Sequence, residues 1–160
     1  MDFRKIEAMT NSFADELIGK LYTSLAASDV TSGGVQLLGM NEETRDAVTV
    51  CLERRKLVAV AGDEQRLLAS DELLQATYAV ARHLNQFRAA DLASELAISL
   101  PNANNRLKRL LEAGALCRQP DPERERGGKQ FTYQLPFGAS TTRGDVLTGP
   151  LWSRFPGSGL

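Results

Sequence analysis

Apolar residues recur every three or four positions over three segments in the second half of the chain. This spacing predicts amphipathic helices over residues 71–86, 89–97 and 100–113. Ser70 and Ser99 are expected as N-caps of the first and third helices, because a serine hydroxyl accepts a hydrogen bond from the free N–H groups of a first turn. The residues expected to face inward are Leu74, Tyr78, Ala81 and Leu84 or Asn85 in the first helix, Ala89, Leu92, Ala93 and Leu96 in the second, and Ala103, Leu107, Leu110 and Leu111 in the third.

The spacing changes after Gly114, a residue that commonly ends a helix. Residues 115–118 and 131–135 favour β-strands, the latter through alternation of apolar and polar side chains. Between them, residues 119–130 hold two Pro, two Gly and a dense run of charges, which predicts a flexible hairpin loop. Helices joined by a short turn and followed by a charged hairpin are the order of a winged helix-turn-helix.

The run from Ala89 to Leu135 resembles the winged helix-turn-helix of MarR-type bacterial transcriptional regulators. The resemblance covers under a third of the chain. It implies that helix 100–113 enters the major groove of duplex DNA and that hairpin 117–135 is the wing. The pieces that carry it are Ala90–Ala93 in the second helix, Ser99–Pro101 and Leu107–Leu116 at the start and end of the recognition helix, and Pro120–Arg126 in the wing.

A similar order of elements emerges in the first half when it is shifted by 59 residues against the second. Helices are predicted over residues 12–27 and 41–55. Residues 30–38 fall where the middle helix lies in the second half. Residues 57–61 and 65–69 favour a short hairpin. Asn41 is expected to cap the second of these helices. The side chains expected to face inward are Phe13, Leu17, Leu21 and Leu25 in the first helix and Ala47, Val48, Cys51 and Leu52 in the second.

These patterns predict a mainly α protein with small β-hairpins, of the α+β class, built as two winged helices in tandem. Residues 1–70 would form a winged-helix-like or dimerisation domain, and residues 71–137 a DNA-binding domain. Residues 138–160 hold five Gly and two Pro without periodicity, which favours a flexible tail. The alternative is a single winged helix with a helical extension for dimerisation.

The charge is divided unevenly along the chain. The total of 19 basic and 20 acidic residues gives −1, which argues against a uniformly basic nucleic-acid coat. Residues 1–70 hold eight basic and eleven acidic residues, a net −3, whereas residues 88–137 hold eight and six, a net +2. Glu42, Glu43 and Asp46 would repel phosphates, so the first half is expected to contact protein, including a second copy.

The candidate DNA-binding residues combine amides with cations. An Asn amide pairs with adenine, and Arg or Lys pairs with guanine or contacts phosphate. Three Asn within four residues are poor helix formers, so helix stability alone does not explain them. The candidates are Asn102, Asn104, Asn105, Arg106, Lys108 and Arg109 on the helix and Arg124, Arg126 and Lys129 on the hairpin.

Other kinds of chemistry find little support in the sequence. One His and two distant Cys give no metal-ligand spacing, and no glycine-rich phosphate loop follows a strand, so we expect no cofactor, no metal and no enzymatic activity. Without an apolar run of about 18 residues or a signal peptide, a cytoplasmic protein without membrane contact is expected. Cys51 is expected inward and inert, while Cys117 beside Arg118 leaves redox sensing open.

The leading hypothesis is a sequence-specific double-stranded DNA-binding protein, a transcriptional regulator of bacterial or phage type that acts as a homodimer. The competing hypothesis is a non-catalytic assembly module that resembles the kleisin-binding subunits of bacterial condensin. In that case Trp152 and Phe155 of the tail would bind a protein partner. A small-molecule-responsive regulator is a minor third interpretation.

Overall fold

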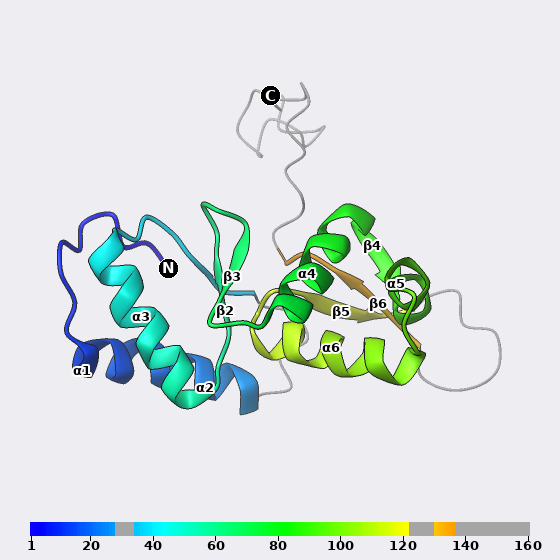
Figure 1. Cartoon of the computed structure of the whole chain (residues 1–160), viewed down its shortest axis with the longest axis horizontal. Coiled ribbons are helices and arrows are strands. Elements are labelled where there is room, and N and C mark those ends of the chain that lie inside the picture. Colours follow the sequence, from blue (N-terminus) through cyan, green and yellow to red (C-terminus); the bar gives the residue numbers. More distant parts are fainter. Residues whose placement is uncertain (28–33, 122–129, 137–160) are drawn as a thin grey trace, which may run out of the picture.

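The computed structural model describes residues 1–27, 34–121 and 130–136, which form helices packed on two three-stranded sheets (Figure 1). This mixed α and β architecture agrees with the expected α+β class. The elements in chain order are α1 (Asn11–Ala14), the π-helical η1 (Asp15–Gly19), α2 (Lys20–Ala27), β1 (Gln36–Leu37), α3 (Glu42–Arg55), β2 (Ala59–Ala61), β3 (Arg66–Leu68), α4 (Glu72–Leu84), β4 (Gln86–Arg88), α5 (Ala89–Leu96), α6 (Leu100–Glu112), β5 (Cys117–Pro120) and β6 (Phe131–Gln134).

The caps of the second half are mostly those that the sequence predicts. Ser99 Oγ accepts from the N–H of Asn102 at 3.4 Å and begins α6, and Gly114 follows its end with φ +67°. The N-cap of α4 is Asp71, and the prediction of Ser70 is wrong by one residue. Asp71 is extended, and its Oδ1 accepts from the N–H of Leu74 at 2.7 Å, so the carboxylate meets the first turn directly.

The helix predicted over 71–86 ends at Leu84, because the chain turns at Asn85 with φ +59° and continues as β4. β4 pairs antiparallel with β6, which pairs antiparallel with β5, so the sheet order is β4-β6-β5. The rings of Phe87 and Tyr133 stack across this sheet with centroids 5.9 Å apart. β4 has only three residues and one buried apolar side chain, so the alternation of apolar and polar residues is too short to predict it from the sequence.

The first half departs from the predicted second copy. Residues 36–37 are a strand, so the prediction of a helix over 30–38 is wrong there; residues 28–33 lie outside the described part. β1 pairs parallel with β2, and the sheet order is β1-β2-β3. In this sheet β1 therefore lies beside β2, the next strand along the chain. In the other sheet β4 lies beside β6, the last strand of the three. Helix 42–55 and its cap Asn41, whose Oδ1 accepts from the N–H of Thr44 at 2.8 Å, are confirmed.

The helical run 11–27, named here the N-terminal helix, faces the core through a different row from the predicted one. The inner row, Ala14, Ile18 and Tyr22, is fully buried. Phe13 and Leu17 are exposed, so their predicted inward orientation is wrong; the side chains of Leu21 and Leu25 are partly buried against the core. Both rows are apolar and adjacent, and the periodicity of an isolated helix does not say which one its neighbours cover.

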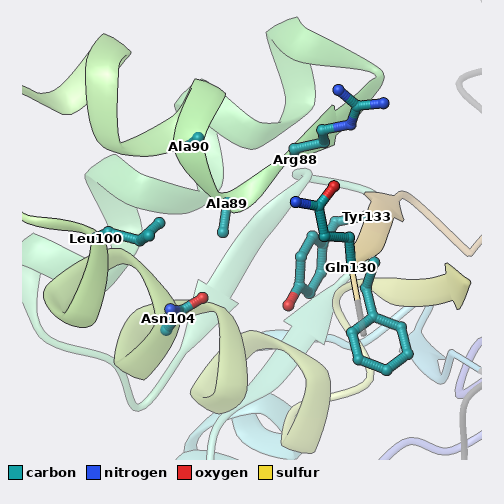
Figure 2. Close-up of a pocket in the computed structure, with 8 residues that line it drawn as sticks. Arg88, Ala89, Ala90, Leu100, Asn104, Gln130 and Tyr133 are labelled. Atoms are coloured by element: carbon teal, nitrogen blue, oxygen red, sulfur yellow. The ribbon is translucent and has the colours of Figure 1, made fainter. Parts of the chain in front are cut away.

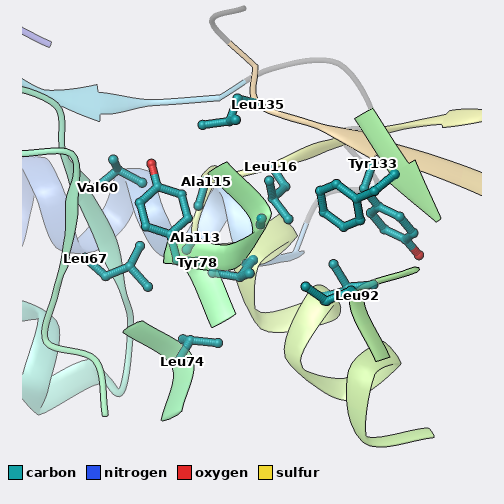
Figure 3. Close-up of a cluster of buried hydrophobic side chains, with 14 residues drawn as sticks. Val60, Leu67, Leu74, Tyr78, Leu92, Ala113, Ala115, Leu116, Tyr133 and Leu135 are labelled. Atoms are coloured by element: carbon teal, nitrogen blue, oxygen red, sulfur yellow. The ribbon is translucent and has the colours of Figure 1, made fainter. Parts of the chain in front are cut away.

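The hairpin β2–β3 lies between α3 and α4 (Figure 1). Its strands bury side chains on both faces. Val60 and Leu67 are opposite in register and join the cluster that contains Tyr78 (Figure 3). Ala59 and Leu68, the next opposite pair, join the cluster of the N-terminal helix and α3. Because side chains alternate along a strand, this hairpin supplies side chains to two cores at once.

Candidate nucleic-acid interface

Helix α6 carries the candidate residues on the surface left by its buried row. Ala103, Leu107 and Leu110 are fully buried and attach the helix to the core. The six predicted polar and charged side chains lie outside this row and divide between two flanks and an outer surface. The position of each side chain, on a flank or on the outer surface, decides whether it is available for contact with a ligand.

One flank of α6 is bonded to α4. Arg106 donates from Nη1 to Thr77 Oγ1 at 3.0 Å and from Nε to Asn102 Oδ1 at 3.1 Å. Arg109 donates from Nη1 to Asp71 Oδ2 at 2.8 Å. This bond is the main reason why the pKa of Asp71 lies below its usual value, and the N–H of Leu74 adds to it. Two predicted DNA-binding arginines are therefore engaged within the protein.

The outer surface of α6 carries Asn105 and Lys108, both exposed. The side chain of Lys108 is 76% exposed, and its Nζ lies 3.9 Å from a carboxylate oxygen of Glu112 one turn later. A solvated pair at this distance holds its members weakly. Lys108 is thus the cation of α6 that is most accessible to an approaching anion.

The other flank of α6 borders an open pocket of about 360 Å³ between α5, α6 and β6 (Figure 2). Leu100 and Asn104 line it from α6, and Leu100 is 48% exposed. The side-chain amide of Asn104 makes no hydrogen bond to another described residue. The other lining residues are Arg88, Ala89, Ala90, Gln130, Phe131 and Tyr133.

The ends of β5 and β6 are anchored beside this pocket. Arg88 Nε donates to Oδ2 of the buried Asp121 at 2.6 Å, and the guanidinium of Arg118 lies 4.5 Å from the ring centre of Phe131. Sequence reasoning missed Arg88 and Asp121, because only strand pairing brings positions 33 apart together. The predicted wing residues Arg124, Arg126 and Lys129, and the predicted partner-binding Trp152 and Phe155, lie outside the described residues.

A second, wider groove of about 750 Å³ separates α3 from α4. Its lining includes four carboxylates and two arginines, so its character is mixed and more acidic than that of α6. A surface of this kind does not suit a phosphate backbone. These charged residues are Asp46, Glu53, Asp71, Glu72, Arg45 and Arg66.

The described residues hold no group of three or more His, Cys, Asp or Glu that could bind a metal ion. Cys51 faces inward as predicted, and burial, helped by the nearby Asp15, raises the pKa of its thiol. Cys117 is buried as well. Within the same part of the chain, no helix is long and apolar enough to cross a membrane.

Comparison with known proteins identifies no relative. No protein-family model matches the chain, and no curated protein or solved structure matches it either. The chain's own residues around α6 therefore carry the evidence for a function.

Proposed function

We propose that residues 72–136 form a winged helix-turn-helix that binds duplex DNA, and that the protein is a transcriptional regulator of bacterial or phage type. The observation that carries this proposal is the connectivity α4–β4–α5–α6–β5–β6 with the sheet order β4-β6-β5. Residues 97–99 join α5 to α6 as a short turn, and the hairpin follows directly. This is the order of a helix-turn-helix with a wing, in keeping with the resemblance of residues 89–135 to MarR-type regulators.

In this proposal the start of α6 enters the major groove. Asn104 and Asn105 are exposed there, and the fork of an Asn amide matches N6 and N7 of adenine. Leu100, one turn before Asn104, offers an apolar contact to a thymine methyl group. Lys108, farther along the helix, would neutralise a phosphate or pair with guanine. The wing beyond β5 would contact the adjacent backbone.

The two bonded arginines contribute less directly than their charge suggests. Arg109 has to leave Asp71, and Arg106 has to leave Thr77 and Asn102, before either donates to DNA. The expected affinity of one copy is therefore modest, and we propose that two copies bind two half-sites.

A salt titration of binding to duplex DNA tests the function. We expect the logarithm of the association constant to fall linearly and steeply with the logarithm of salt concentration, because phosphate contacts release counterions. Replacing one contacting cation, in Lys108→Ala, reduces this slope by about 1. The exposed Lys5→Ala, in the first half, is the matched control, with the same charge change and an unchanged slope. A flat salt response of the intact protein would refute the proposal.

The groove between α3 and α4 supports a second candidate, a non-catalytic protein-interaction subunit of a DNA-associated complex. Its four carboxylates favour a basic partner segment over DNA. Glu53→Lys with Glu72→Lys would then abolish partner binding and leave the salt response of DNA binding unchanged. A comparison of residues 1–137 with the full chain tests whether the tail takes part in that contact.

A further inference from the structure

The N-terminal helix has a second apolar row that nothing in the described part of the chain covers completely. This outer row is Phe13, Leu17 and Leu21. Phe13 and Leu17 are 53% and 37% exposed, whereas Leu21 is partly buried at the edge of the core. An isolated exposed Leu is ordinary, but two large apolar side chains four residues apart on one helix form a continuous surface.

The π-helical turn η1 lies within this stretch and keeps the row straight. In an α-helix, residues four apart drift around the axis, since a turn holds 3.6 residues. A π-turn holds more than four residues and reverses the drift between Phe13 and Leu21. The inner and outer rows therefore run side by side, one covered by the protein and the other facing solvent.

The charged side chains beside the outer row are complementary in charge to the same side chains of a second copy. Glu16 and Lys20 are both more than 60% exposed and form an ion pair one turn apart. In the sequence this pair brackets Leu17, the middle residue of the outer row. An antiparallel copy of the same helix would place its Lys20 opposite Glu16, and its Glu16 opposite Lys20.

We infer that the outer row is the contact surface for a second copy of this chain, which docks antiparallel about a twofold axis near Leu17. Phe13 then packs beside Leu21 of the second copy, and Leu17 packs beside Leu17 of the second copy. Two Glu16–Lys20 pairs form across the contact. One acid and one base beside the row give no net charge, which suits self-association better than an anionic lipid surface.

Measurement of the mass in solution tests this contact without DNA, so its outcome is separate from that of the proposed function. At tens of micromolar the full chain should have twice the 17.5 kDa mass of one chain. Phe13→Glu with Leu17→Glu should be monomeric, with unchanged helical circular dichroism because both side chains are exposed. Leu73→Glu, at a 64% exposed position on α4, is the matched control and should stay dimeric.

A charge exchange tests the antiparallel arrangement itself. Glu16→Lys should weaken the dimer about tenfold by placing like charges opposite each other, and the further change Lys20→Glu should restore it. A wild-type chain that is monomeric at these concentrations would overturn the inference. A dimer that persists in the Phe13→Glu, Leu17→Glu variant would also overturn it, as would a Glu16→Lys, Lys20→Glu variant that does not regain the dimer. A chain that dimerises only after removal of residues 138–160 would overturn it too, because the tail would then be the occupant of the outer row.

Discussion

Arg109 on α6 donates from Nη1 to Oδ2 of Asp71, the residue that caps α4, across 2.8 Å. The carboxylate of Asp71 thus serves two elements, since its other oxygen accepts from the N–H of Leu74. Both side chains of the ion pair are about half exposed, so the pair adds little to stability. Its larger effect is on position, because it holds a cation of the proposed DNA-binding helix against the protein.

Asp71→Asn should therefore strengthen DNA binding. Asn caps a helix about as well as Asp, so α4 should keep its start, while Arg109 loses its charged partner and the interface loses a negative charge. We expect a several-fold higher affinity at low salt and a salt slope steeper by up to about 1. Fluorescence anisotropy with labelled duplex measures both. In the Arg109→Ala background the same substitution should lose most of its effect; equal effects in both backgrounds would contradict a role for this pair.

Leu67→Ala should destabilise both halves of the molecule together. Leu67 is 2% exposed and faces Val60 within the cluster that contains Tyr78, while its strand neighbour Leu68 packs in the other cluster. Truncation of a buried Leu costs about 2–5 kcal/mol. Hydrogen exchange should show equal loss of protection in α3 and α6. Leu73→Ala, at an exposed site, should change stability by less than about 0.5 kcal/mol. Loss confined to α6 would mean that the hairpin does not couple the cores.

Gly114→Ala should destabilise the protein by more than about 1 kcal/mol. Gly114 has φ +67°, and a Cβ atom there would lie 2.9 Å from the backbone nitrogen of Val35. The substitution therefore combines backbone strain with a contact between the halves. Urea unfolding measures the loss. Ala97→Gly, at a non-glycine residue with φ +52°, should act in the opposite direction by relieving strain, and equal destabilisation by both would refute this reasoning.

The ion pair between Asp15 and Arg55 should make stability depend on acid pH. Arg55 donates from Nε and Nη2 to the carboxylate at 2.7 Å each, and these bonds lower the pKa of Asp15 from 3.8 to about 2. A lowered folded-state pKa means that the stabilisation is complete above about pH 4 and is lost as pH falls toward 2. Asp15→Asn should be less stable than the wild type at neutral pH, and the difference should shrink below pH 4 in urea titrations. A difference that is independent of pH would contradict the assignment.

Local signals in the sequence predicted most helices. The caps Asn41 and Ser99, the helical spacing of α3, α5 and α6, and the positive φ of Gly114 depend on residues within a few positions of one another. Such features follow from helix geometry and the hydrogen-bonding capacity of nearby side chains. For the same reason, the polar character of the α6 surface could be predicted from the spacing of its apolar residues.

Tertiary structure decided what depends on distant partners. Whether Phe13 or Ala14 faces the core depends on where α3 packs, because both apolar rows satisfy the same helical period. The strand β4 exists because β6 pairs with it, not because of its own sequence. Arg109 counts as a surface cation in the sequence, yet Asp71, 38 positions away, holds it. The sequence by itself determined most of the helical segments and which side chains can bind. Only packing between segments determined which of those side chains are covered, paired or exposed, because burial and ion pairing are properties of neighbours in space.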